Sequence, residues 1–186
     1  YNGVRYQRTS FASHRDKVIV IHLKANKPKS VSGRIHLADM HGASIKANGR
    51  SLKSEGRMSN GFEYEAQLLV IPARGAVSAA TAAADNPWKI AVPTQSLTLE
   101  ACDSVTLILA AGTNFAQDHS KGWLGPHPHQ KVSQAVTSAS KRSFPDLMAR
   151  HIKDYQELFR RVTLNIGTTT PEVLSQTTEG RLKAYL

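Results

Sequence analysis

The fold of this chain rests on one apolar run, Ser104-Val105-Thr106-Leu107-Ile108-Leu109-Ala110-Ala111. Successive side chains of a strand point to opposite faces, so a run that is apolar on both faces predicts a strand with protein packed on each side. A second run has the same character, Lys17-Val18-Ile19-Val20-Ile21-His22-Leu23-Lys24. We therefore expect two central strands in a sheet that is covered on both faces.

Shorter segments around these runs alternate between apolar and polar residues. The pattern is clear over residues 4–11, 31–37 and 62–70, and a Lys27-Pro28 turn separates the strand at 17–24 from the one at 31–37. We expect those two strands to pair as an antiparallel hairpin. Many strands without amphipathic helices between them predict a mainly β fold, an antiparallel β-sandwich over residues 1–118.

The pattern changes to a helical one after residue 118. Apolar residues at helical spacing predict a helix over 128–142, and a second helix starts after Ser143, whose side chain is spaced to cap it together with Asp146. An apolar stripe continues from Phe144 to Val162 and is typical of a face that packs against another element. Residues 163–167 alternate again and predict a returning strand, and a further helix begins near residue 178. We therefore interpret 119–186 as a helical linker, with two or three helices, that leads into another domain.

Both ends of the sequence are those expected of a segment from inside a longer protein. Residues 1–6 contain neither an initiator Met nor a signal-peptide pattern, and the last residues read as a helix without a stop signal. No apolar run approaches the ~20 residues that cross a bilayer, so no membrane insertion is expected.

The composition is that of a basic globular protein, with a formal net charge of +10. The basic residues are scattered along the strands, and the aromatic interleaving of nucleic-acid-binding modules is missing, so we expect no nucleic-acid partner. The chain has one cysteine, Cys102, which excludes an intrachain disulfide and is expected to pack in the core.

Three segments together resemble glycoside hydrolase family 95, the α-L-fucosidases of bacteria. The first resembles a strand pair of that family's N-terminal sandwich, the second its last long strand, and the third the helix and strand that link the sandwich to the catalytic barrel. They are residues 11–20, residues 103–115 and the run His151-Ile152-Lys153-Asp154-Tyr155-Gln156-Glu157-Leu158-Phe159-Arg160-Arg161-Val162 with its continuation to Gly167.

This resemblance implies a super-sandwich-like domain from a parent enzyme that removes terminal α-linked L-fucose from glycans with inversion. It also implies bacterial origin, a secreted or periplasmic location, and a downstream (α/α)6 barrel as the intramolecular partner. The family's catalytic groups are a glutamic acid and asparagines in an Asn-x-Asn motif, which this sequence lacks. The catalytic residues are accordingly expected after Leu186, and no cofactor is expected.

Few residues of the chain itself are candidates for a site. Trp88 and Trp123 lie in predicted loops, where exposed rings could contact a sugar, although core anchoring or interdomain packing is the more common role of such residues. His127-Pro128-His129 could chelate a metal, but a site needs a third or fourth ligand, so no metal is expected. Ser13, His14 and Asp16 suggest a hydrolase triad, but neighbours in a strand face opposite ways. The glutamates are expected to be surface carboxylates: Glu55, Glu63, Glu65, Glu100 and Glu157.

Two alternatives of other classes remain at this point. A non-catalytic carbohydrate-binding module would use the loop tryptophans directly. A nucleic-acid-binding sandwich rests only on the net charge and would bind with a steep dependence on salt.

Overall fold

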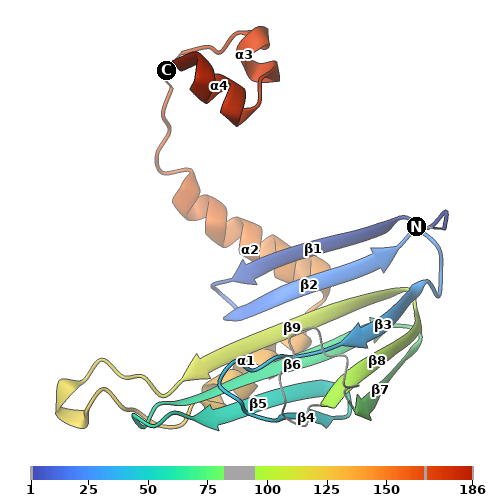
Figure 1. Cartoon of the computed structure of the whole chain (residues 1–186), viewed down its shortest axis with the longest axis vertical. Coiled ribbons are helices and arrows are strands. Elements are labelled where there is room, and N and C mark those ends of the chain that lie inside the picture. The colour runs from blue at the N-terminus through green and yellow to red at the C-terminus, as the bar shows by residue number, and fades with distance from the viewer. Residues whose placement is uncertain (1, 82–94, 166, 186) are drawn as a thin grey trace. The chain divides into compact units, whose positions relative to one another are not determined.

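The computed structural model describes residues 2–81, 95–165 and 167–185, and the strands found there form two antiparallel sheets (Figure 1). The larger sheet has six strands in the order β1-β2-β9-β6-β5-β4, and the smaller has three in the order β3-β8-β7. Their bounds are β1 Tyr6–Ser13, β2 Val18–Ala25, β3 Val31–Ile35, β4 Ile45–Asn48, β5 Ser51–Arg57, β6 Glu63–Ala73, β7 Ala76–Thr81, β8 Gln95–Cys102 and β9 Ser104–Thr113. The predicted antiparallel sandwich is confirmed.

The predicted hairpin between the second and third strands is wrong. β2 pairs with β1 and β9 in the larger sheet, whereas β3 pairs with β8 in the smaller one. Residues 26–30 connect β2 of the larger sheet to β3 of the smaller sheet, and two hydrogen bonds hold this connection. The Asn26 side chain accepts from the backbone N–H of Arg5 at 2.8 Å, and the Asp103 side chain accepts from the backbone N–H of Lys29 at 2.7 Å. Alternation along a strand specifies its faces but not its partner, which explains the error.

The first hydrophobic core fills the space between the two sheets. Val105 and Leu107 of β9 face it, together with Leu97 and Leu99 of β8 from the opposite sheet. Cys102 is fully buried in this core, which confirms its predicted packing role, and burial raises the pKa of its thiol.

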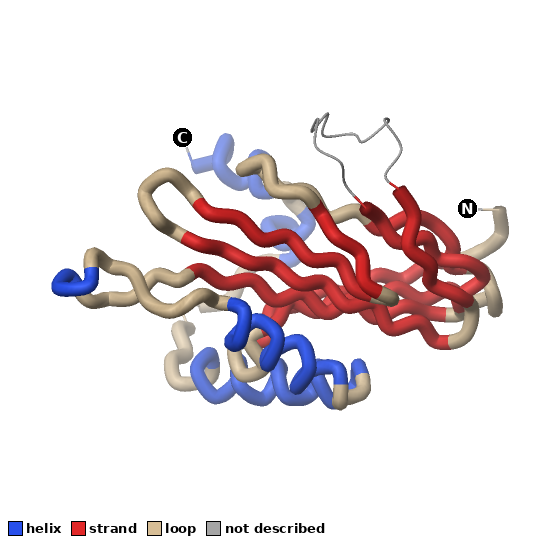
Figure 2. Tube along the Cα trace, turned by 90° about the horizontal axis from the view of Figure 1, so that it is seen from below, coloured by secondary structure: helices blue, strands red, loops and turns tan. Residues whose placement is uncertain are grey.

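The second core lies between the other face of the larger sheet and the helices α1 (His129–Ser140) and α2 (Phe144–Phe159). The alternate side chains of β9, Ile108 and Ala110, belong to it and meet Val132 and Val136 of α1. In Figure 2 the two helices lie along one side of the strands. β9 is therefore buried on both faces, as its sequence predicts.

The start of α2 is fixed by a side-chain cap and by aromatic contacts. Ser143 Oγ accepts from the backbone N–H of Asp146 at 3.2 Å, which confirms the predicted cap. The Phe144 ring stacks on His22 of β2 with centroids 4.1 Å apart, and Leu147 is buried in the second core. These contacts attach the first turn of α2 to the sheet.

The chain divides into two compact units, Tyr1–Asp154 and Tyr155–Leu186. The second contains the last turn of α2 and the helices α3 (Pro171–Ser175) and α4 (Thr178–Tyr185). Its apolar residues are largely exposed, including Leu158, Phe159 and Val162, the end of the predicted stripe. The strand predicted at 163–167 does not form at the described residues 163–165 and 167, where no sheet edge pairs with the chain.

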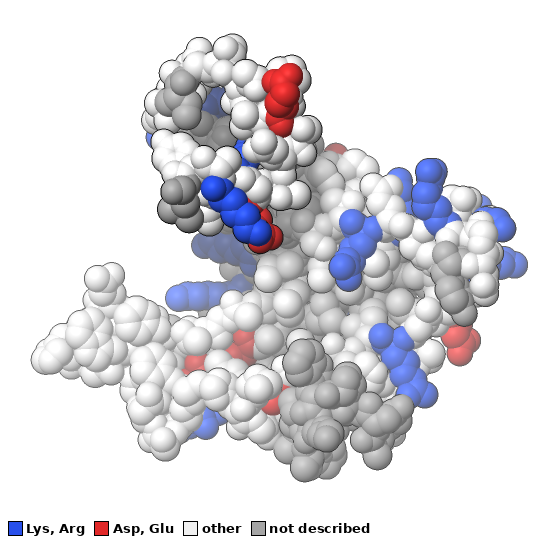
Figure 3. All heavy atoms as spheres, turned by 45° about the horizontal axis from the view of Figure 1, so that its top comes forward, with Lys and Arg blue, Asp and Glu red and all other residues white. Residues whose placement is uncertain are grey.

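The basic residues stand apart from one another on the face drawn in Figure 3, where Lys and Arg side chains form separate groups. This agrees with their scattered positions in the sequence. Among the described helices, none has the length and apolar character needed to span a membrane.

The two-sided burial of β9 predicts unequal losses for two matched substitutions. Ile108→Ala removes a fully buried side chain and should lower the free energy of unfolding by about 2–5 kcal/mol. Ile19→Ala changes a side chain that is 44% exposed on β2, and should cost at most about 1 kcal/mol. Denaturant unfolding of the chain measures both values, and equal losses would contradict the assignment of β9 as the central strand.

Candidate aromatic loop and basic groove

A long loop over residues 114–128 connects β9 to α1 and extends beyond the end of the larger sheet (Figures 1 and 2). Three aromatic rings lie along its base in near-parallel planes. The Phe62 and Phe115 centroids are 6.2 Å apart, and those of Phe115 and Trp123 are 6.3 Å apart with planes only 5° from parallel. Because Phe115 is 54% and Trp123 42% exposed, this aromatic row offers an apolar surface to a ligand.

Backbone hydrogen bonds keep the two arms of this loop together. The N–H of Ala116 donates to the carbonyl of Trp123 at 2.9 Å, and the N–H of Trp123 donates to that of Asp118 at 3.0 Å. Asp118 also caps the short 3-10 helix η1 (His119–Lys121), which ends at Gly122 in the left-handed conformation. The loop is thus an ordered extension of the sheet rather than a slack connection.

Only one of the two predicted sugar-contact candidates lies within the described residues. Trp88 falls outside the described residues. Trp123 lies on the exposed loop and has a backbone φ of 65°, a left-handed conformation that a bulky residue rarely adopts. Its ring is 42% exposed rather than buried in a core, and the sugar contact stays a prediction.

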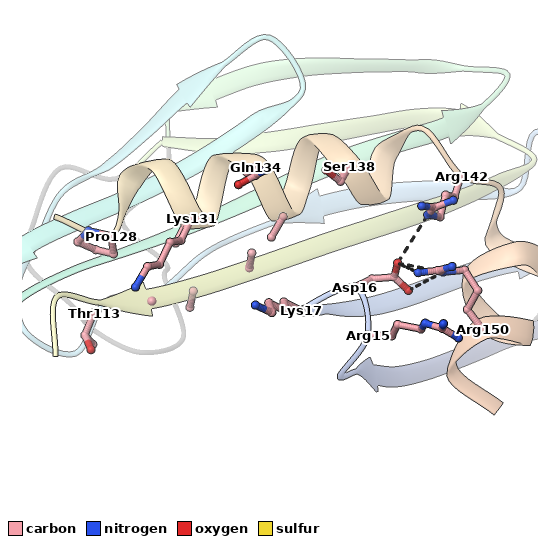
Figure 4. Close-up of a pocket in the computed structure, with 15 residues that line it drawn as sticks. Arg15, Asp16, Lys17, Thr113, Pro128, Lys131, Gln134, Ser138, Arg142 and Arg150 are labelled. Atoms are coloured by element: carbon pink, nitrogen blue, oxygen red, sulfur yellow. Dashed lines mark hydrogen bonds and ion pairs between the residues drawn. The ribbon is translucent and has the colours of Figure 1, made fainter. Parts of the chain in front are cut away.

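A basic groove of about 500 Å³ lies beside this loop, at the edge between β9, the β1–β2 turn and the two helices (Figure 4). Ala110, Ala111 and Gly112 of β9 line it. The charged side chains that line this basic groove are Arg15, Asp16, Lys17, Lys131, Arg142 and Arg150. No sequence pattern indicates this grouping, because its members come from distant segments and share no local motif.

Asp16 is the anionic centre of the groove. Its carboxylate accepts from Arg150 Nε at 3.1 Å, lies 3.6 Å from Arg142 Nε, and accepts from Ser13 Oγ at 2.8 Å. Burial opposes ionisation, but the hydrogen bonds from Arg150 and Ser13 and the two guanidinium charges outweigh it and lower the pKa of Asp16. Asp16 thereby ties the β1–β2 turn to α2 and to the connection between α1 and α2.

The suggested triad of Ser13, His14 and Asp16 is excluded by these contacts. The hydroxyl of Ser13 donates to Asp16, and the His14 side chain is 91% exposed, with Nδ1 3.5 Å from Asp154. Among the described residues, the partner of the Ser13 hydroxyl is the Asp16 carboxylate and not an imidazole that could take its proton.

One glutamate differs from the sequence prediction. Glu65 is 1% exposed rather than a surface carboxylate, because the start of α1 covers it. Nδ1 of His129 lies 3.0 and 2.9 Å from its two oxygens, and Nε2 of Gln67 donates to Oε1 at 2.5 Å. A strand pattern could not reveal this, since the covering residue is 64 positions away.

Comparison with known proteins shows which families the chain is similar to. The family model described as "Glycosyl hydrolase family 65, N-terminal domain" matches residues 1–118. The match has the same bounds as the predicted sandwich.

Two curated relatives extend beyond this region. A "Probable alpha-fucosidase A" of Aspergillus niger is 26% identical over 193 residues, covering 93% of the chain and 22% of the relative. An "Alpha-L-fucosidase 2" of Arabidopsis thaliana is 28% identical over 211 residues, covering 95% of the chain and 23% of the relative. The chain therefore spans less than a quarter of the length of these relatives.

Asp16→Asn should lower the free energy of unfolding by about 2 kcal/mol at neutral pH, because it removes charge-assisted hydrogen bonds from Arg150. The pKa of Asp16 is lower in the folded chain than its ordinary 3.8, so the carboxylate stabilises the fold above that pH. This stabilisation disappears as the pH falls through the folded-state pKa.

The difference between wild type and Asp16→Asn should consequently shrink on acidification below pH ~4. Urea unfolding at neutral and acidic pH measures it, with Glu100→Gln, an exposed carboxylate on β8, as the control that should change little. A difference that stays constant with pH would show that Asp16 does not act through its charge.

Proposed function

The chain belongs to the family of glycosyl hydrolase family 65 N-terminal domains, and we propose that it forms the sandwich and linker portion of an α-L-fucosidase. The parent enzyme would hydrolyse terminal α-L-fucosyl linkages in glycans with inversion of configuration. The observation that carries this proposal is that both relatives have fucosidase names and align with the sandwich and the helices together, over nearly the whole chain.

The proposed role of the chain within that enzyme is structural rather than catalytic. An inverting glycosidase needs two groups roughly 6.5–9.5 Å apart, so that a water molecule fits between one of them and the sugar. Glu55 and Glu65 have ligand oxygens within 4.8 Å of each other, closer than that spacing, and Glu65 is buried beneath α1. We propose that the catalytic groups lie in an (α/α)6 barrel after Leu186, as the family resemblance implies. Secretion or periplasmic export remains a prediction.

The aromatic row supports a direct contribution to substrate binding. Phe115 and Trp123 are exposed on a loop that extends past the sheet, and flat aromatic faces suit the apolar faces of pyranose rings. Within the proposed enzyme this loop would border the substrate site. The same surface would serve the alternative function, a non-catalytic carbohydrate-binding module.

Hydrolysis of a fucosylated oligosaccharide tests the proposal. The protein encoded by the complete open reading frame and the 186-residue chain are assayed side by side. We expect fucose release by the complete protein only. Activity in the isolated chain would contradict the non-catalytic role, and a complete protein that binds the glycan without cleaving it would establish the binding-module alternative.

Trp123→Ala in the complete protein should reduce kcat/KM for the oligosaccharide roughly tenfold, which corresponds to about 1.4 kcal/mol of lost contact. Tyr6→Ala removes an aromatic side chain of similar exposure on β1 and serves as the control. Equal kcat/KM values for Trp123→Ala and wild type would rule out the sugar contact.

A further inference from the structure

Three metal-ligating side chains from separate elements converge near the start of α1. Glu55 lies on β5, Glu65 on β6 and His127 on the loop of residues 114–128, and one ligand atom of each lies within 4.8 Å of those of the other two. His127-Pro128-His129 by itself lacks the further ligands that a metal site needs. The fold supplies them as two carboxylates.

The arrangement places like charges next to each other in the sheet. Glu55 and Glu65 are directly opposite in the antiparallel register of β5 and β6. Like charges in that position destabilise a strand pair, and a cation between them would relieve that repulsion. The partners of the buried Glu65 carboxylate are His129 and Gln67. The cation now nearest Glu55 is Lys53, whose Nζ lies 2.9 Å from Oε2, on the exposed side of the pair.

Neighbouring residues hold the buried carboxylate in a fixed orientation. His129 Nδ1 contacts both oxygens of Glu65, Gln67 Nε2 donates to Oε1, and the same Gln67 group donates to Ser133 Oγ at 2.7 Å. Hydrogen bonds of this kind orient the ligands of metal sites and affect affinity strongly. Glu65 is therefore a preorganised ligand rather than a flexible surface group.

We propose that Glu55, Glu65 and His127 bind a divalent transition-metal ion, with Zn²⁺ as the best match. One imidazole nitrogen and two carboxylates are a ligand set for Zn²⁺, whereas Ca²⁺ and Mg²⁺ prefer oxygen ligands alone. Water would complete the coordination sphere on the exposed side. The ion would take the place of Lys53 beside Glu55.

The binding of His127 requires one small local change. Its Nδ1 accepts a hydrogen bond from the backbone N–H of His129 at 3.2 Å. An ion at Nδ1 replaces this bond directly, and an ion at Nε2 leaves the ring proton on Nδ1, which ends it as well. The bond is exposed, so its loss costs little against a metal–nitrogen bond.

The consequence of the site is a link between the sheet and the loop that carries Trp123. Such an ion would connect β5 and β6 to residues 114–128 and stabilise the aromatic row in place. This inference stands independently of the hydrolase proposal, since it concerns binding by this chain alone.

Calorimetric titration of the chain with Zn²⁺ tests the site directly, after removal of any purification tag and dialysis against a chelator. We expect one ion bound per chain and a rise in Tm on its addition, because an ion that binds only the folded state stabilises it. Glu55→Gln and His127→Ala should each weaken Zn²⁺ binding at least tenfold, as roughly expected when a ligand is lost. Both positions are exposed, so the variants should fold.

Glu100→Gln and His36→Ala provide matched controls, because they make the same chemical changes at exposed positions elsewhere and should keep wild-type affinity. Circular dichroism confirms that each variant is folded. The proposal is wrong if Zn²⁺ neither binds nor raises Tm, or if His127→Ala binds it as tightly as wild type. Equal affinity for Mg²⁺ would also overturn the assignment to a transition metal.

Discussion

The burial of β9 on both faces is the constraint on which the rest of the structure depends. Val105 and Leu107 pack between the sheets while Ile108 and Ala110 pack against the helices, so one strand belongs to both cores. Its backbone is also paired on each side, with β2 and β6. A strand in that position cannot shift by one residue without exchanging its two sets of side chains, which fixes the register of the larger sheet.

This constraint also determines where the candidate sites lie. The end of β9 leads directly into the loop of residues 114–128, and its Ala110–Gly112 segment lines the basic groove. α1 returns along the same strand and brings His129 over Glu65, while Asp16 holds the neighbouring turn to Arg150. The aromatic row, the groove and the glutamate–histidine cluster are therefore all positioned from one end of the central strand.

The sequence was sufficient for what depends on local pattern. It predicted the two-sided strands, the antiparallel sandwich, the helix near 128–142 and the Ser143 cap, because each is encoded within a few neighbouring residues. It was wrong where distant partners decide: β3 belongs to the other sheet, no strand forms at 163–165, and Glu65 is buried by a histidine from α1. The candidate sites divide in the same way between local and distant information. The sequence alone indicates Trp123 as a loop aromatic, whereas only the fold brings together the groove around Asp16 and the carboxylates beside His127.

Native-state hydrogen exchange tests the central role of β9 most directly. If β9 joins both cores, the amides of residues 105–110 and those of α1 should exchange only through global unfolding, with the same free energy. Much faster exchange in α1 than in β9 would contradict this account, because it would show that the helix detaches while the sandwich remains folded.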